Sequence, residues 1–111
     1  KMSGLKMLKM VQDFRRFDPD IQSQTMAIFF YVAIHSKGKF ADTGVPMTAI
    51  ADDLDMAQSS VSRNISILSK WKWSRKEGLN FVETREDPME RRRKLVSLTN
   101  RGQRFYDSVN N

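Results

Sequence analysis

The spacing of apolar side chains predicts a helix over residues 3–17. Apolar residues recur there every three or four positions, which places them on one face of a helix. This apolar stripe consists of Met7, Met10, Val11, Phe14 and Phe17. The stripe either packs on its own domain or pairs with a second subunit, because a chain of 111 residues has few other elements to cover it.

A second helix is predicted to begin at Asp18-Pro19-Asp20. Asp18 is a favourable N-cap, Pro19 suits the first helical position, and acid is favoured in the first turn. The apolar pattern continues to about Ser36, so this helix is expected to be the central helix of the core. Its expected inner face consists of Met26, Ile28, Phe29, Phe30, Ala33 and Ile34. His35, the only histidine, lies near its end and has no partner for metal binding or catalysis.

Two short amphipathic segments then predict a helix-turn-helix. A loop with glycine and proline covers about residues 37–46, and a first short helix covers 47–54. Asp55 lies at the turn, and aspartate tolerates the left-handed conformation that a turn requires. The second helix covers residues 56–68, with Val61, Ile65 and Leu68 as its apolar face.

The other face of this second helix is small, polar and free of acidic residues. It consists of Gln58, Ser59, Ser62, Arg63 and Ser66. Such side chains suit the major groove of DNA, where base edges offer hydrogen-bond donors and acceptors. The same composition also fits a solvated amphipathic helix, so the remaining chain has to decide between the two interpretations.

A β-hairpin and a closing helix are predicted after residue 78. Strands are expected at 79–85 and 94–98, joined by a turn at Glu86-Asp87-Pro88 and a basic tip at residues 90–94. Thr99 is expected to cap the closing helix, whose inner face consists of Phe105, Tyr106 and Val109. The predicted fold class is mainly α with a small β-hairpin, a winged helix-turn-helix. Residues 1–17 form an N-terminal helix that is a possible dimerisation arm, and residues 18–111 form the winged domain.

The two tryptophans, Trp71 and Trp73, precede this hairpin. Trp71 continues the apolar stripe three residues after Leu68, so at least one tryptophan is expected to fill the core. Stacking of these rings on single-stranded bases is the less favoured alternative. The seven methionines are interpreted as core filler.

Basic charge is concentrated in the second half of the chain. Residues 1–55 carry seven basic and seven acidic side chains, whereas residues 56–111 carry twelve and six. The net charge is +6 and the pI is about 9.9. A one-sided basic surface favours a polyanionic partner, because neutralising phosphates releases their counterions. The arginines at the hairpin tip, Arg91, Arg92 and Arg93, are expected to contact DNA rather than only solvent.

Composition also excludes several functional classes. Cysteine is absent, which removes disulfides and thiolate metal sites and fits a reducing cytoplasm. The longest apolar run, residues 26–34, is about half of the ~20 residues that span a bilayer, so we expect no membrane partner. No glycine-rich phosphate loop, metal-ligand cluster or nucleophile–base pair is recognisable. We therefore expect a protein that is not an enzyme and uses no cofactor or metal.

The segment from Asp87 to Gly102 closely resembles the wing of the MarR (multiple antibiotic resistance regulator) family. That wing reads approximately Asp-Pro-x-Asp-x-Arg-x-x-x-Val-x-Leu-Thr-x-x-Gly. Glu90 stands in the second acidic position and Arg92 in the position of the wing arginine. The direct matches are Asp87, Pro88, Val96, Leu98, Thr99 and Gly102. Upstream, Ser60-Val61-Ser62-Arg63 resembles the core of the family's recognition helix.

The resemblance covers roughly residues 20–110 and includes three departures. Ala57 stands where serine or threonine is the usual N-cap, and additional residues around 71–80 separate the recognition helix from the wing. The family's long final helix is shortened here. The resemblance implies a homodimeric, sequence-specific regulator of transcription, a repressor, that binds double-stranded DNA. It also implies a cytoplasmic protein of bacterial or phage origin, associated with the nucleoid, that can take a small-molecule effector.

The resemblance implies a role for each matched residue. The recognition helix, residues 57–69, enters the major groove, and the wing, residues 79–98, lies on the minor groove and phosphates. Arg92 is the groove or phosphate contact, with Glu90 holding it through a charge-assisted hydrogen bond. The expected DNA-binding residues are Thr48, Gln58, Ser59, Ser60, Ser62, Arg63, Arg91, Arg92 and Arg93.

Two other functions remain open at this point. A phage- or plasmid-type replication initiator also uses winged helices on DNA, and a winged helix can instead bind an acidic protein partner. Salt-dependent binding to a palindromic duplex favours the regulator. Binding to direct repeats with origin melting favours the initiator, and no DNA binding at physiological salt favours the protein-interaction module.

Overall fold

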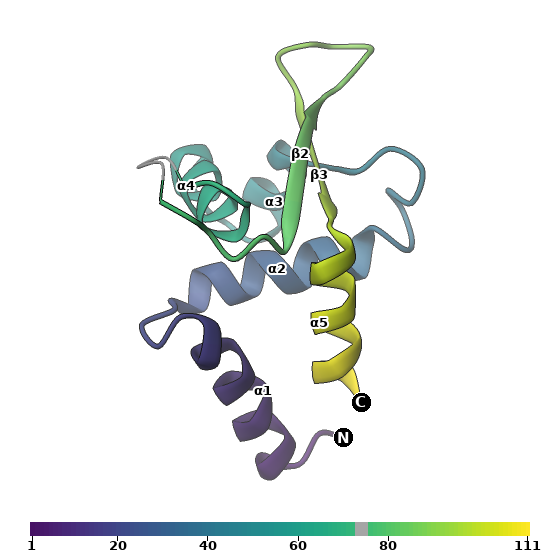
Figure 1. The fold of residues 1–111 in the computed structure, drawn as a ribbon. Helices are drawn as coiled ribbons and strands as arrows, with labels where there is room; N and C mark the ends of the chain where they lie inside the picture. Colours follow the sequence, from purple (N-terminus) through teal and green to yellow (C-terminus); the bar gives the residue numbers. More distant parts are fainter. Residues whose placement is uncertain (73–75) are drawn as a thin grey trace.

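A computed structural model of the chain describes residues 1–72 and 76–111. Within them, five helices are combined with a small antiparallel sheet, which confirms the winged helix-turn-helix fold (Figure 1). In chain order the elements are α1 (Gly4–Phe17), α2 (Ser23–His35), β1 (Val45–Pro46), α3 (Met47–Asp53), α4 (Gln58–Leu68), β2 (Val82–Glu86), β3 (Lys94–Leu98) and α5 (Asn100–Asn110). In the described part of the chain, no helix is long and apolar enough to cross a membrane.

The sheet has the strand order β1-β3-β2, and both pairings are antiparallel. Val82 pairs with Leu98 and Glu86 with Lys94, so β2 and β3 form one continuous hairpin. Figure 1 shows this hairpin, the wing, projecting from the body on the side opposite α1 and the two chain ends. The two-residue strand β1, which the sequence pattern did not predict, joins the wing to the helix-turn-helix because it leads directly into α3.

The predicted start of the central helix at Asp18 is wrong. α2 begins at Ser23, and Asp18 instead ends α1, where its backbone N–H donates to the Phe14 carbonyl at 3.1 Å. The Asp18 carboxylate accepts a hydrogen bond from the backbone N–H of Asp20 at 3.1 Å. Aspartate before proline therefore forms a turn between two helices, a role that these residue types serve as well as N-capping.

The predicted first strand also begins too early, because β2 starts at Val82. The backbone N–H groups of Leu79 and Phe81 donate to the Ile67 and Leu68 carbonyls at 3.0 and 2.8 Å. These residues thus satisfy carbonyls at the end of α4, which have no partner inside the helix. The alternating pattern of residues 79–81 reflects burial against α4 rather than pairing in a sheet.

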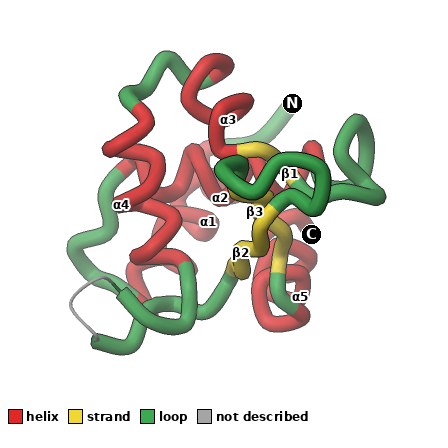
Figure 2. The backbone as a smooth tube through the Cα atoms, turned by 90° about the horizontal axis from the view of Figure 1, so that it is seen from above, coloured by secondary structure: helices red, strands yellow, loops and turns green. Residues whose placement is uncertain are grey.

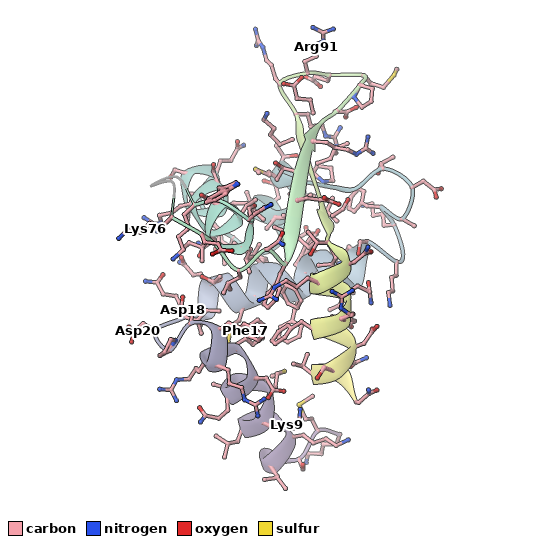
Figure 3. The ribbon with its side chains drawn as sticks, in the orientation of Figure 1. Lys9, Phe17, Asp18, Asp20, Lys76 and Arg91 are labelled. Carbon is pink, nitrogen blue, oxygen red and sulfur yellow. The ribbon has the colours of Figure 1, made fainter. Side chains whose placement is uncertain are left out.

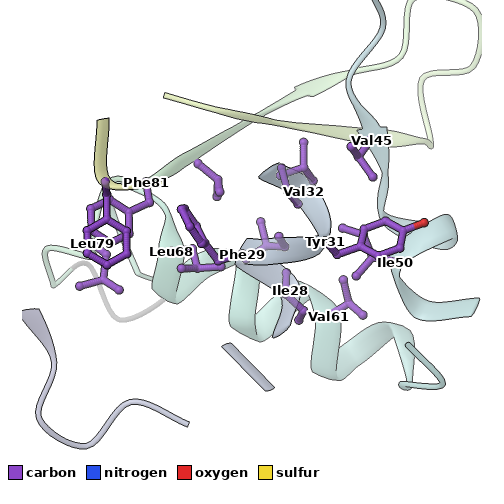
Figure 4. Packing of buried hydrophobic residues seen from close by; sticks show 14 of the residues in the cluster. Ile28, Phe29, Tyr31, Val32, Val45, Ile50, Val61, Leu68, Leu79 and Phe81 are labelled. Carbon is purple, nitrogen blue, oxygen red and sulfur yellow. The ribbon is translucent and has the colours of Figure 1, made fainter. Parts of the chain in front are cut away.

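α2 is the central core helix, as predicted. Ile28, Phe29, Val32 and Ala33 have no exposed surface, and they pack between the helix-turn-helix, the sheet and α5 (Figure 4). The prediction that Ile34 broadens this inner face is wrong, because its side chain is 56% exposed.

Of the two tryptophans, of which at least one was expected to fill the core, Trp71 does not, because its side chain is 61% exposed. The chain leaves the axis of α4 at Ser69, where the backbone becomes extended. The helical stripe therefore does not continue to Trp71. Trp73 lies outside the described residues.

Aromatic rings join the N- and C-terminal helices to α2. Phe14 of α1 contacts Phe29 and Phe105 edge-on, with ring centroids 5.6 and 4.8 Å apart, and Phe81 stacks on Phe105 at 4.6 Å. The Arg101 guanidinium lies over the Phe81 ring and donates from Nε to the Leu79 carbonyl at 3.0 Å. This cluster holds α1, α2 and α5 together with the segment that precedes the wing.

Part of the apolar stripe of α1 packs on its own domain, and the rest is exposed. Phe14 is fully buried in its own domain, and Met10 and Val11 are half-buried. Met7 and Phe17 remain exposed. The first turns of α1 therefore carry apolar surface that its own domain does not cover.

We expect Gly102→Ala to destabilise the fold by about 1–3 kcal/mol or more, because no space exists for a side chain. A Cβ at Gly102 would lie 2.0 Å from the Phe81 carbonyl oxygen, which accepts the backbone N–H of Thr99 at 3.0 Å. Thermal unfolding followed by circular dichroism measures the change. Gly38→Ala is the matched control, since a Cβ there meets nothing within 4 Å. Equal melting temperatures for the two variants would contradict the expectation.

Candidate nucleic-acid interface

The exposed face of α4 carries four of the nine predicted DNA-binding residues. Gln58, Ser59, Ser62 and Arg63 are exposed, while Val61, Ile65 and Leu68 on the opposite face are buried. Ser59, Ser62 and Arg63 line one shallow depression together with Ser66. The face therefore presents hydroxyl groups and one guanidinium, with no carboxylate among them.

The start of α4 has no side-chain cap, as the alanine at position 57 suggested. Ala57 occupies the N-cap position and makes no capping hydrogen bond. The preceding turn holds Asp55 in the left-handed region, with φ 52°, which confirms the expected role of this aspartate. The N-cap side chain therefore provides no acceptor for the first amide groups of α4.

Ser60, also predicted to contact DNA, is turned toward α2. Its Oγ donates to Oε1 of Gln24 at 3.2 Å, and its side chain is half-buried. The structure thus separates Ser60 from the other recognition residues. Its hydroxyl helps to fix α4 on α2 rather than pointing out with Ser59 and Ser62.

The buried face of α4 contains one polar residue, Asn64, which is only 1% exposed. Its Oδ1 accepts a hydrogen bond from Thr25 Oγ1 at 2.6 Å, and Thr25 is also 1% exposed. Its Nδ2 donates to the Ser60 carbonyl at 2.9 Å and approaches Gln24 Oε1 at 3.5 Å. We name these four residues, Gln24, Thr25, Ser60 and Asn64, the polar clasp.

The sequence pattern missed the polar clasp. The available signal was Asn64 itself, a polar residue three positions after Val61 on the apolar face of the helix. A buried amide without partners is costly, so an asparagine at such a position indicates a specific partner on a neighbouring element. Only the fold identifies that partner as Thr25.

A second polar contact holds α3. The Tyr31 hydroxyl donates to Asp53 Oδ2 at 2.6 Å. Burial, the hydrogen bond to Asp53 and the negative charge of Asp53 together raise the pKa of Tyr31 to about 12. The phenol therefore stays protonated at neutral pH and remains a donor. Both helices of the helix-turn-helix are thus tied to α2 by directional contacts.

The wing tip carries three exposed arginines, Arg91, Arg92 and Arg93. Asp87 shapes this tip, since its backbone N–H donates to the Arg93 carbonyl at 2.8 Å and its Oδ1 accepts from the Met89 backbone N–H at 2.9 Å. Figure 3 places Arg91 at the end of the wing that lies farthest from α1.

The expected pairing of Glu90 with Arg92 is wrong. In the described part of the chain, the ion pairs on the wing are Asp87 with Arg93 and Glu86 with Lys94, each at 3.9 Å. Glu90 acts through its backbone, because its carbonyl accepts the Arg93 N–H at 2.9 Å. The acidic groups that pair with wing cations therefore lie at the neck of the wing.

Thr48 lies near the base of the wing. Its side chain is exposed at the start of α3 and lines a shallow depression with Glu90, Arg92 and Arg93. The predicted residues thus form two groups, one on α4 and one between α3 and the wing. Gln58 and Arg91 lie outside both depressions but are exposed on the same two elements.

The elements that carry the two groups, α4 and the wing, lie next to each other in the fold. Viewed along the wing, α4 lies across the body beside the base of the wing, and neither element covers the other (Figure 2). The Arg85 guanidinium steadies the wing by donating to the Thr43 carbonyl at 2.5 Å. A protruding basic hairpin beside an exposed polar helix is the arrangement that winged helix-turn-helix proteins present to double-stranded DNA.

Comparison with solved structures shows which known proteins share this fold. The structure matches MepR of Staphylococcus aureus in a complex with DNA, with a TM-score of 0.69 and 20% identity, over 95% of this chain and 76% of that one. It also matches MepR described as a transcription regulator of the multidrug efflux pump MepA, with a TM-score of 0.67 and 20% identity, over 96% and 66% of the two chains.

A third match is the transcriptional regulator PcaV of Streptomyces coelicolor in complex with its natural ligand. Its TM-score is 0.61 at 16% identity, over 96% of this chain and 64% of that one. These neighbours are winged-helix regulators of the MarR family, and this chain has their fold, as the resemblance of its wing predicted.

The chain spans 63% to 76% of the length of the MepR chains it matches. At the level of sequence, no protein-family model and no curated protein matches it.

We expect removal of one partner of the polar clasp to destabilise the protein more than removal of both. Asn64→Leu leaves the Thr25 hydroxyl buried without an acceptor, which costs about 1–3 kcal/mol. The double variant Thr25→Val with Asn64→Leu removes both polar groups and should recover most of that loss. Urea unfolding of the two single variants and the double variant measures the coupling. Additive losses would contradict a specific bond between the two side chains.

Proposed function

We propose that this chain is a sequence-specific, double-stranded DNA-binding regulator of transcription that acts as a repressor. α4 lies in the major groove, and the wing lies over the adjacent minor groove and its phosphates. The observation that carries the proposal is a protruding wing with three exposed arginines next to a helix whose exposed face is polar. We propose that it acts in the nucleoid of a bacterium, on an operator of the host or of a phage.

The α4 side chains suit discrimination between base pairs. Arg63 can donate two hydrogen bonds to a guanine edge, and Ser59 and Ser62 can donate to or accept from several bases. Gln58 lies in the first turn, where amide side chains pair with adenine. A single arginine and small hydroxyls give modest affinity, so we assign to α4 the choice of sequence rather than most of the binding strength.

The wing arginines suit the phosphate backbone and a narrow minor groove. A guanidinium attracts phosphate oxygens and inserts where the groove has enhanced negative potential. Arg91 and Arg92 have no ion pair within the described residues, so their charge faces outward. Arg93 is held by Asp87, which limits its orientation. The neighbour structure of MepR with DNA supports this use of the fold.

Arg92→Ala should weaken binding to every duplex and lower the slope of log K against log salt by about 1, because one phosphate contact is lost. Fluorescence anisotropy of a labelled duplex at several salt concentrations measures this slope. The matched control is Arg104→Ala, which removes the same charge from the exposed side of α5. An unchanged slope for the Arg92 variant would remove this arginine from the contact surface.

The same titration separates the two elements and the competing functions. Arg63→Ala should change the ranking of duplexes, because it alters a base contact, whereas Arg92→Ala should preserve the ranking. A preference for direct repeats with strand opening would indicate a replication initiator. Absence of binding to any duplex at physiological salt would contradict the regulator and indicate a protein partner.

We also propose that two copies pair through the first turns of α1. Leu5 and Leu8 are 78% and 59% exposed, and Met7 lies exposed beside them. A homodimer explains this uncovered apolar face, and it also provides two recognition helices for a two-fold symmetric site.

Leu5→Lys with Leu8→Lys should convert dimers to monomers at micromolar concentration. Each leucine loses about 1.5–3 kcal/mol of burial, so the dimer weakens by more than tenfold. Sedimentation velocity measures the oligomeric state, and Phe14 is left intact because it belongs to the core. Met89→Lys, on the wing tip, is the control for changing an exposed apolar side chain. Dimers that persist in the leucine variant would refute pairing through the first turns of α1.

A further inference from the structure

The segment between α4 and β2 contains a second small hairpin. The Lys72 backbone N–H donates to the Lys76 carbonyl and the Gly78 N–H to the Lys70 carbonyl, both at 2.8 Å. Trp71 and Glu77 pair across it as an antiparallel bridge. We name the described residues of this element, 70–72 and 76–78, the basic hairpin.

The basic hairpin is fixed to the last turn of α4. A Cβ at Gly78 would lie 2.0 Å from the Ser69 carbonyl oxygen and 2.8 Å from the Ile67 oxygen, so only glycine allows this approach. The Leu79 N–H then donates to the Ile67 carbonyl at 3.0 Å. The position of the hairpin is therefore set by α4. A partner that binds the exposed face of α4 also lies near the hairpin.

The hairpin presents cations to solvent. Lys70 and Lys76 are exposed and Lys72 is half-buried. Within the described residues, no ion pair engages any of these three lysines. Glu77 is the only acidic residue of the element. Three unpaired ammonium groups on a fixed backbone attract a polyanion without the cost of ordering a flexible tail.

Trp71 is the second unusual feature of this hairpin. An indole that is 61% exposed leaves a large apolar ring and its N–H donor in water. Such a side chain is enriched at interfaces, because the ring covers apolar surface while the N–H finds an acceptor. Next to lysines, the matching surface is a sugar–phosphate backbone, which offers apolar sugar edges and phosphate oxygens.

The hairpin lies at the far end of α4 from the turn that begins the helix. Figure 3 places Lys76 at the side of α4 away from the wing. An 11-residue helix is ~16 Å long, whereas the major groove is about 12 Å wide. A residue just beyond the end of a helix that crosses the groove therefore lies near the phosphates that border the groove.

We propose that the basic hairpin is a third DNA-contacting element, which binds backbone phosphates at the edge of the groove that α4 occupies. Lys70 and Lys76 supply the charge, and Trp71 packs on the sugar–phosphate backbone beside them. This inference rests on the proposed binding of double-stranded DNA. In this arrangement two phosphate-binding elements flank α4, with the wing on one side and the basic hairpin on the other.

The first test is the salt dependence of duplex binding. Lys70→Gln with Lys76→Gln should lower the slope of log K against log salt by about 2, since each lost phosphate contact accounts for about 0.9. The control, Lys37→Gln with Arg104→Gln, removes the same charge from exposed positions just after α2 and on α5 and should leave the slope unchanged. Circular dichroism and sedimentation confirm equal folding and assembly of both variants.

The second test uses intrinsic fluorescence. Trp71 and Trp73 are the only tryptophans of the chain, so the variant Trp73→Phe leaves Trp71 as the sole emitter. Addition of a bound duplex should shift or quench its emission, with a midpoint equal to that from anisotropy of the labelled DNA. An indole in water that never meets the DNA would show no such change.

The outcomes separate this inference from the proposed function. An unchanged slope in the lysine variant and unchanged emission, with Arg92→Ala still lowering the slope, would overturn the inference while the regulator stands. Stronger quenching by single-stranded oligonucleotide than by duplex would also overturn it, in favour of base stacking. No binding of wild-type protein to any duplex would overturn both.

Discussion

The hydrogen bond between Thr25 and Asn64 fixes how α4 packs on α2. Apolar contacts between α2 and α4 supply most of the attraction, but they are non-directional and allow the helix to slide or rotate. A buried side-chain amide has a defined partner in only one register, and leaving it unpaired is costly. The orientation of the exposed face of α4, which carries Arg63, is therefore determined from the inside of the molecule.

The helix α2 also positions every other part of the proposed interface. The contact of Tyr31 with Asp53 holds α3 on α2, while β1 and the bond from Arg85 to Thr43 join the wing to the loop that follows α2. α4, the wing and the basic hairpin are thus attached to one rigid scaffold at separate points. Their spacing does not depend on flexible linkers, as recognition of a fixed groove geometry requires.

The sequence predicted the fold well where local patterns decide it. The helix-turn-helix, β3 and the Thr99 cap follow from apolar periodicity and capping chemistry. The pattern failed where two roles share one sequence: the turn at Asp18 resembles a helix start, and residues 79–81 alternate like a strand although they bind the end of α4. The partners of Asn64, and the exposure of Trp71, depend on contacts between distant segments, which no local pattern contains.

The position of β2 at the outside of the sheet has a consequence for solubility. β2 is an edge strand, and the backbone groups on its open side could pair with a strand of another molecule. Its exposed side chains include Glu83, Arg85 and Glu86, so a second copy approaching edge to edge would strip these charged groups of water. The charged edge thus allows the wing to protrude as a bare two-stranded ribbon without seeding aggregation.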